Sequence, residues 1–419
     1  MTTDILHNRV EISPVDVSKA ESQCTSATTI SMLAACGKRT FVSVIFEIAR
    51  LWFGSGCLSL DEYLELKLFD KVAYKGVDKG SFVGLKAARK IWFKANYRIE
   101  LFAMATNKIA SSIWFAAHGL PILPTIAIYH EKVGRHNARL LRDDDALRTF
   151  LKTSEHYPIF GKPISGCQSI GSAGIESYRD GVLTTTAGRL ISLDDFITYV
   201  KTHAATGYQF QSRISPHAII NEMCGDRLAT VRVLTIVKDG KPQILRACWK
   251  IPAGLHIADN FWRAGNLLAQ LDLASGRVER VIRRVGNSFE EVTHHPDTGR
   301  RIEGMFVPNW TDITKLAIEA ANLLDGLPLV GWDIAPTESG AVLVESNITP
   351  DFQIHQISDR RGILDATFED FLKQRKSDAA SMRRSFRRMA SESRSVFLRK
   401  CGREVMSAIR RPSRKRIAG

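Results

Sequence analysis

The spacing of apolar residues predicts a helical N-terminal part, followed by a longer part built from short strands and helices. Residues 1–38 are rich in Ser and Thr and show no period, which is typical of a loose lead-in. From residue 39 to about residue 95 the period is helical, and a capping box of Ser59 and Glu62 predicts where a further helix begins. The apolar residues that carry the first helical period are Val42, Ile45, Phe46, Ala49 and Phe53. By pattern alone, this region is a scaffold without chemistry.

After residue 105 the apolar runs become short and are bounded by Gly, Pro and Ser. Helices are predicted over Asn107–Gly119, which ends in Gly, and over the amphipathic segment Ile313–Leu324. Strands are predicted over Thr125–Tyr129, Tyr157–Lys162, Gly181–Thr186, Tyr208–Ile214, Thr230–Lys238, Gln243–Ile251, Leu329–Ala335 and Ala341–Ser346. No internal repeat is found. Helices mixed with mostly antiparallel strands predict an α+β fold rather than a doubly wound parallel sheet.

The charge of the chain is concentrated near its C-terminal end. The 419 residues include 58 Lys or Arg and 44 Asp or Glu, a formal net charge of +14. Residues 373–419 hold 16 of the basic residues and three of the acidic ones, which leaves 42 basic and 41 acidic residues elsewhere. The pattern therefore indicates a near-neutral globular body with a basic tail, and not a nucleic-acid-binding body.

The basic tail has three interpretations. Several apolar residues, among them Phe386, Val396 and Phe397, fall at helical spacing between the arginines. Such a segment suits an anionic membrane surface. A basic segment also binds RNA without sequence preference. The third interpretation is a solvated, partly helical tail without a dedicated partner. The composition favours the first and the third over nucleic acid.

Cysteine usage and the N-terminal sequence predict a cytoplasmic, reducing compartment. The seven cysteines are scattered and form no Cys-x-x-Cys motif, which argues against zinc ribbons and thioredoxin-like redox sites. The first residues lack a basic segment followed by an apolar core, so no secretory signal is expected. Phe41–Phe53 is apolar but short, and it carries Glu47 and Arg50, so it is not expected to span a bilayer. The tail would bring the protein to the inner face of the membrane.

The predicted strand pair near residue 340 carries candidate metal ligands. Glu345 and Asn347 share one face of their strand because side chains alternate, and Asp333 can lie across from them on the neighbouring strand. Two carboxylates and an amide oxygen suit Mg²⁺, which proteins bind through one or two carboxylates together with nucleotide phosphates. A polar strand end solvated at a turn is the alternative interpretation.

A loop of small residues follows the strand that ends at Lys162. Its glycines allow close approach of the backbone, and its N–H groups and hydroxyls could surround phosphate oxygens. Lys162 would add a point charge. The loop is not a Walker A motif, and a plain flexible loop remains the alternative. The loop residues considered as phosphate ligands are Ser165, Gly166, Ser169 and Gly171.

Taken together, these segments resemble the sugar-transfer-associated, α-L-glutamate-ligase-related group of the ATP-grasp superfamily, over roughly residues 107–356. The metal strands and the Lys-Pro strand also look like those of D-alanine–D-alanine ligases. The ordered series that carries the resemblance is Asn107–Lys108, Gly119–Leu120–Pro121, Gly161–Lys162–Pro163, Gln211–Ser212–Arg213–Ile214–Ser215–Pro216–His217, Thr230–Val231–Arg232, Trp249–Lys250–Ile251, Asp259–Asn260–Phe261, His295–Pro296–Asp297–Thr298–Gly299, Pro308–Asn309–Trp310, Gly331–Trp332–Asp333 and Glu345–Ser346–Asn347.

The resemblance implies a role for each matching residue. Lys108 and Lys162 would hold ATP phosphates, and Lys250 would do so from the opposite subdomain. Arg232 would contact phosphate or an acyl phosphate. The hinge beside the adenine would be Gln211, Ser212, Arg213 and Ile214, and the Mg²⁺ ligands would be Asp333, Glu345 and Asn347. There are two departures. Trp262–Asn266 replaces a Gly-rich stretch that would face the acceptor, and Lys250 stands where the group often has Arg, which keeps the charge but not the bidentate phosphate geometry.

The resemblance further implies an ATP-grasp fold and carboxylate–amine ligation through an acyl phosphate, in the modification of cell-surface sugars or polysaccharide precursors. An ATP-grasp kinase that phosphorylates a hydroxyl and a non-catalytic ATP-binding scaffold anchored by the tail remain open. The expected parts are a lead-in at 1–38, a helical region at 39–105, a small ATP-grasp subdomain with the phosphate loop at 106–210, a C-terminal subdomain with the metal site at 211–372, and the tail at 373–419.

Overall fold

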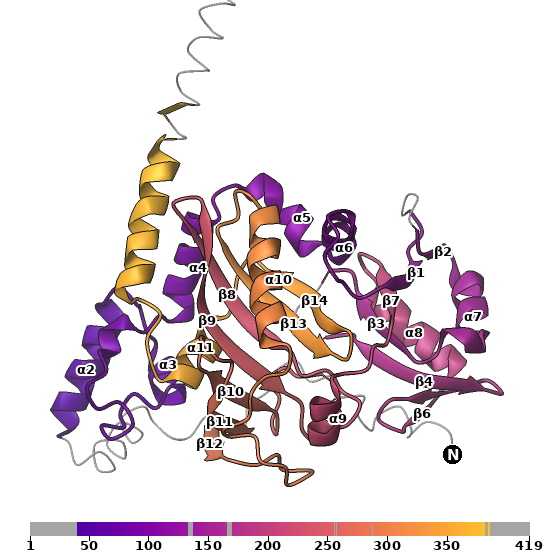
Figure 1. The fold of residues 1–419 in the computed structure, drawn as a ribbon, viewed down its shortest axis with the longest axis horizontal. Coiled ribbons are helices and arrows are strands. Elements are labelled where there is room, and N and C mark those ends of the chain that lie inside the picture. Colours follow the sequence, from indigo (N-terminus) through magenta and orange to yellow (C-terminus); the bar gives the residue numbers. More distant parts are fainter. Residues whose placement is uncertain are drawn as a thin grey trace, which may run out of the picture.

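The computed structural model describes residues 40–132, 137–165, 170–254, 256, 258–286, 288–381 and 384–385. These residues form two seven-stranded sheets with helices packed around them (Figure 1). The expected lead-in at 1–38 lies outside the described residues, as does most of the expected tail. The architecture is α+β, as the sequence predicted.

The first sheet comprises β1 (Thr125–Tyr129), β2 (Arg139–Leu141), β3 (Ile159–Pro163), β4 (Ala173–Arg179), β5 (Val182–Thr185), β6 (Leu190–Ser192) and β7 (Tyr208–Ser212). Its strand order is β2-β1-β7-β3-β4-β5-β6. Helices α7 (Asp144–Lys152) and α8 (Leu193–His203) bury Phe150 and Phe196 in the same core as Ile159 and Phe210 of the sheet. Among the described strands only β1 and β2 pair in parallel, which fits the predicted antiparallel character.

The second sheet comprises β8 (Val231–Lys238), β9 (Lys241–Ile251), β10 (Leu267–Leu271), β11 (Val278–Val285), β12 (Ser288–Val292), β13 (Leu329–Thr337) and β14 (Gly340–Asn347). Its strand order is β12-β11-β10-β9-β8-β13-β14. Helix α10 (Trp310–Leu323) packs Ile313 and Ala317 against Val233 and Trp332 on one face. Helix α11 (Phe352–Asp359) and the helix at residues 366–381 lie on the other face (Figure 1).

The N-terminal helices are α2 (Phe41–Phe53), α3 (Leu60–Glu65) and α4 (Leu85–Ala95), and they pack against the second sheet. The buried Asn96 donates to the carbonyls of Leu329 and Ile348 at 2.7 and 2.9 Å, and it accepts from the N–H of Leu329. Gln356 of α11 makes a matching pair of bonds with the backbone of Val83. These bonds attach the helical region to β13 and α11.

Several predicted elements are confirmed. The remaining helices are α5 (Phe102–Thr106), α6 (Lys108–Ala117) and α9 (Ala218–Cys224), with 3-10 turns at Lys79–Ser81, Ile99–Leu101 and Ser154–His156. Helix α6 starts one residue after the predicted start at Asn107, which is its N-cap, and the capping box of Ser59 and Glu62 is present at α3. Two expected boundaries fall inside elements: the one at 210/211 cuts β7, and the one at 372/373 cuts the helix at 366–381. Strand β7 continues through residue 211 because its backbone pairing with β3 extends to Ser212. The helix at 366–381 begins before residue 372 and buries Phe368 and Phe371 in the core.

Candidate active site

A cavity of about 360 Å³ lies between the two sheets. Residues of β3, β4 and β7 line it from the first sheet, and residues of β8, β9, β13 and β14 line it from the second. Eleven of the residues singled out in the sequence line this one cavity: Lys108, Lys162, Gln211, Ser212, Arg213, Ile214, Arg232, Lys250, Asp333, Glu345 and Asn347. Segments that are more than 200 residues apart in the chain therefore meet here.

The pairing of the second sheet brings the candidate metal ligands together. Strands β13 and β14 pair antiparallel around the predicted turn, with Asp333 opposite Glu345 and Gly331 opposite Asn347. A bulge follows Asp333, where the register shifts before Ile334. On its other side, β13 pairs with β8, which places Asp333 opposite Arg232. The two carboxylates and the arginine thus project from adjacent strands into the cavity.

Asp333 is held by two cations. Arg232 donates from Nε and Nη2 to its two carboxylate oxygens at 2.5 and 2.8 Å, and Lys250 Nζ lies 3.1 Å from Oδ1. Burial alone would raise the pKa of Asp333, but the charges and hydrogen bonds of Arg232 and Lys250 hold it well below its usual range. Asp333 is therefore ionised at neutral pH, although it is almost entirely buried.

Lys250 also contacts a second carboxylate. Its Nζ lies 3.4 Å from Asp259 Oδ1, and Asp259 Oδ2 accepts from the N–H of Thr230 at 2.7 Å. Burial works to lower the pKa of Lys250, but Asp259 and Asp333 outweigh it and raise the pKa. Arg232, Lys250, Asp259 and Asp333 consequently form one charged cluster on the floor of the cavity.

Two lysines face this cluster from the other side of the cavity. Lys108, the first residue of α6, lies 3.5 Å from Glu345 Oε1. Lys162 of β3 is 7% exposed, and the described residues offer its side chain no hydrogen bond or ion pair. Burial lowers its pKa to about 8, with Lys108 acting in the same direction and Glu345 opposing. Binding of an anion next to Lys162 would be favourable, because it would offset the hydration that the buried ammonium group has lost.

The small-residue loop between β3 and β4 matches the prediction only in part. Gly166 and Ser169 lie outside the described residues, and Ser165 does not line the cavity, whereas Ile170 and Ser172 do. Gly171 does not line it either. Its φ is +76°, a Cβ there would approach the ring of His203 to 2.8 Å, and its carbonyl accepts from Tyr208. The structure thus explains this glycine by backbone conformation and packing rather than by contact with a ligand.

The four residues of the predicted hinge segment, 211–214, all line the cavity. Ile214 lies there with residues that sequence reasoning did not single out: Leu123, Phe160, Ile170, Leu228 and Val344. Gln211 donates to the carbonyl of Leu123, and Arg213 pairs with Glu176 and Asp226 at 2.6 and 2.7 Å. A cavity lined by apolar side chains together with a few polar groups suits a flat heteroaromatic ring.

The cavity is also lined by Asp351, which the sequence did not identify as functional, next to Trp262. Asp351 caps α11 and accepts from Trp262 Nε1 at 2.7 Å. Burial raises the pKa of Asp351. Both residues line the cavity. An Asp after Pro350, at the start of an apolar run, is a helix-start signal, but that signal does not reveal that the side chain lines the cavity and accepts from Trp262, 89 residues earlier in the chain.

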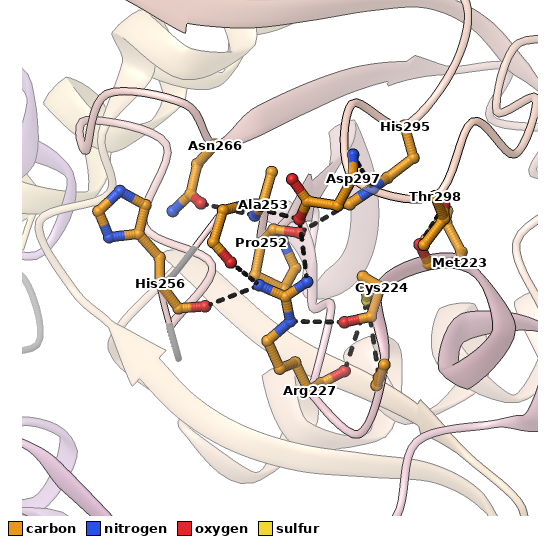
Figure 2. Close-up of polar contacts among 12 residues, drawn as sticks. Met223, Cys224, Arg227, Pro252, Ala253, His256, Asn266, His295, Asp297 and Thr298 are labelled. Carbon is orange, nitrogen blue, oxygen red and sulfur yellow. Dashed lines mark hydrogen bonds and ion pairs between the residues drawn. The ribbon is translucent and has the colours of Figure 1, made fainter. Parts of the chain in front are cut away.

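A polar clamp holds the loop that leads to Asp259 (Figure 2). Arg227 donates to the carbonyls of Cys224, Gly254 and His256 and pairs with Asp297 at 3.3 Å. Asp297 accepts from the N–H of Gly254 at 2.7 Å. Buried His295 lies 2.9 Å from the carbonyl of Pro252, and burial lowers its pKa, which keeps it neutral. The clamp fixes the backbone before Asp259.

The ligand set of the expected metal fits Mg²⁺ in its chemistry. Asp333, Glu345 and Asn347 supply hard oxygen donors, and the buried Asn347 Nδ2 has no partner among the described residues. The part of the chain that the structure describes contains no group of three His, Cys, Asp or Glu able to hold a metal alone. The set therefore suits a cation that phosphate oxygens also bind.

Comparison with known proteins identifies the family. The chain matches the family model described as sugar-transfer associated ATP-grasp over residues 88–370. No curated protein matches it.

Among solved structures, it is similar to the D-alanine–D-alanine ligase from Coxiella burnetii, at 13% identity, a TM-score of 0.38, and coverage of 67% of this chain and 60% of that one. It is also similar to biotin carboxylase from Campylobacter jejuni, at 11% identity, a TM-score of 0.41, and coverage of 70% and 52%. The chain thus spans between half and two thirds of these proteins' length. The family match covers more than half of the chain, so this protein belongs to the sugar-transfer-associated ATP-grasp family.

Proposed function

We propose that the protein is an ATP-dependent carboxylate–amine ligase that acts through an acyl phosphate. The observation that carries this proposal is the charged cavity between the sheets. In a chain of the ATP-grasp family, four cations surround two carboxylates there: Lys108, Lys162, Arg232 and Lys250 around Asp333 and Glu345.

In this proposal the nucleotide lies along the cavity. Its adenine packs against the apolar side chains of the lining, beside the backbone of residues 211–214. Its phosphates extend toward Lys108 and Lys162, and Lys250 faces them from the second sheet. Support comes from the burial of Lys162 without a partner among the described residues, because phosphate oxygens would supply the missing interaction.

The proposed metal is Mg²⁺, held by Asp333, Glu345 and Asn347. When bound, Mg²⁺ neutralises β- and γ-phosphate charge and aligns the phosphoryl group for transfer. The contribution of the chain is to keep Asp333 ionised through Arg232 and Lys250, so that a carboxylate is available at every pH near neutrality. Glu345 is half-exposed to the cavity and lies next to Lys108.

The proposed reaction has two steps. A substrate carboxylate oxygen attacks the γ-phosphorus, the bond to the bridging oxygen of ADP breaks, and an acyl phosphate forms. An amine then attacks the acyl carbon, the C–N bond forms, inorganic phosphate leaves, and the amine loses a proton. Arg232 and Lys250 are placed to stabilise the negative charge that develops on the transferring phosphoryl and acyl oxygens.

We further propose that the substrates are sugar-linked or small carboxylates and amines, since the family description refers to sugar transfer. We propose that residues 106–210 form the subdomain with the phosphate loop and that residues 211–372 form the subdomain with the metal site. In the cell, we place the protein in the cytoplasm at the inner face of the membrane, with the basic segment at 373–419 as one contact. No helix of the described residues is long and apolar enough to cross a bilayer.

The test is product analysis with Mg²⁺, ATP and a panel of carboxylates and amines. A ligase releases ADP and inorganic phosphate in equal amounts and yields an amide. ADP formation with the phosphate retained on the product would identify a kinase. Nucleotide binding without turnover across the panel would instead support a scaffold. Either of the last two results would overturn the ligase proposal.

A further inference from the structure

The outer face of α2 is apolar and exposed. The residues that produced the helical period in the sequence point away from the body: Val42, Phe46 and Phe53 are 73, 71 and 85% exposed. Ile45 and Trp52 flank this stripe and are also exposed. The opposite face buries Val44 and Leu51 in the core. An apolar helical face of this size, rich in aromatic rings, is uncommon on a monomeric protein and indicates a contact surface.

The N-terminal helical region that carries this face has an excess of exposed basic side chains. Among the exposed charged side chains of residues 41–95, seven are basic and two are acidic. Four of the basic ones, Lys86, Arg89, Lys90 and Lys94, lie on α4, which belongs to the same end of the molecule as α2 (Figure 1). The single acidic residue of α2, Glu47, is neutralised by Lys79 at 3.0 Å. The partner should therefore be negatively charged.

We propose that the outer face of α2 is a membrane-contact surface, which lies in the headgroup region of an anionic bilayer. Phe and Trp on one face, with Lys and Arg around it, are the composition that binds such an interface. At 13 residues, α2 is about 20 Å long, too short to cross a hydrocarbon core of about 30 Å. It therefore lies on the bilayer rather than through it.

Charge argues against a second copy of the chain as the occupant. A symmetric dimer would place this end of one protomer against the same end of its partner. The excess of basic side chains would then face itself across the interface. An anionic lipid surface complements the same charges. The proposal is independent of the nucleotide site and of the basic tail, because α2 supplies apolar contacts that salt does not screen.

The experiment is sedimentation of the full chain with vesicles of phosphatidylcholine, with and without phosphatidylglycerol, at low and high salt. The variant Phe46→Glu with Phe53→Glu changes two exposed side chains on α2. The matched control is Phe306→Glu, which changes a residue 57% exposed near the second sheet. We expect parent and control to sediment with anionic vesicles and to keep part of this binding at high salt. The α2 variant should lose about tenfold or more in partitioning, as expected when two buried Phe contacts are removed.

Three results would overturn the proposal. The first is no sedimentation of the parent with anionic vesicles. The second is equal sedimentation of parent and α2 variant at both salt concentrations. If the α2 variant then also unfolds at lower temperature, another part of this chain covers the helix. The third is a parent dimer that the α2 substitutions convert to a monomer without any change in vesicle binding, which would assign the face to a second copy.

Discussion

Replacing Lys162 with Met tests whether the buried charge of this side chain lowers the stability of the folded protein. Lys162 is 7% exposed, and burial lowers its pKa from 10.5 to about 8. Met has a similar length and fills the same space without a charge. The substitution should therefore stabilise the unliganded protein while it weakens nucleotide binding, because the group that favours an anion is removed.

The pH dependence of this effect has a definite sign. At neutral pH, Lys162 is protonated in the folded and in the unfolded chain, so its full desolvation cost opposes folding. The difference between 10.5 and about 8 corresponds to about 3 kcal/mol, an upper limit for the stabilisation by Met. As the pH rises through 8 toward 10.5, the folded protein loses this proton first. The advantage of the variant shrinks over that range and vanishes above it.

The assay is urea unfolding of parent and variant at neutral pH and above pH 10.5, with and without Mg²⁺ and ADP. We expect a higher urea midpoint for Lys162→Met at neutral pH, equal midpoints at alkaline pH, and a smaller gain from nucleotide, since a ligand stabilises only as far as it binds the native state. Lys152→Met on the first sheet's helix α7 is the control, because Lys152 is exposed and does not line the cavity.

Two outcomes would refute this reasoning. A lower midpoint for Lys162→Met at neutral pH would mean that the ammonium group is held by favourable interactions in the folded state. An undiminished gain from nucleotide would mean that Lys162 does not meet the phosphates, whatever its effect on stability.

Three further predictions concern the carboxylates and the tail. Glu345→Gln should preserve the fold and reduce Mg²⁺-dependent turnover roughly 100-fold; an unchanged Mg²⁺ titration would remove Glu345 from the metal site. Asp333→Asn should lower unfolding stability by about 3–5 kcal/mol in denaturant titration, because it leaves the buried Arg232 without a carboxylate partner and leaves Lys250 with Asp259 alone; a neutral effect would show that Arg232 finds another partner. Truncation after residue 385 should leave nucleotide binding intact and weaken vesicle binding at low salt only; loss of the fold would show that the removed segment packs on the body.

The strand pair that carries the candidate metal ligands was predictable because its signals are local. Two apolar runs separated by a short turn define an antiparallel pair, and alternation puts Glu345 and Asn347 on one face. The position of Asp333 opposite Glu345 does not follow from the turn, because the register of the turn would place Asp333 opposite Val344, and the bulge between Asp333 and Ile334 shifts it by one residue. The salt bridges from Arg232 and Lys250 to Asp333 do not follow, because they depend on the order of β8, β9 and β13 in the sheet.

Helix α2 shows a different limit. The spacing of Val42, Phe46 and Phe53 predicts a helix, and the helix forms. Periodicity identifies an apolar face but does not say whether the protein buries it, and here Val44 and Leu51 on the other side face the core. Val42, Phe46 and Phe53 are exposed because the opposite face of α2 is the one that packs against the body of the protein.

Local sequence patterns therefore account for many of the strands, for the capping box of α3 and for the paired strands that carry the candidate metal ligands. Hydrogen-bonded turns and side-chain alternation depend on residues that are close together in the chain, so they can be recognised in a single sequence. The tertiary structure alone decides that Lys108 meets Glu345, that Asp351 and Trp262 face the same cavity, and that Lys162 is buried without a partner among the described residues. These contacts arise where the two sheets face each other across the cavity, and the burial and charge of each group there depend on residues far apart in the chain.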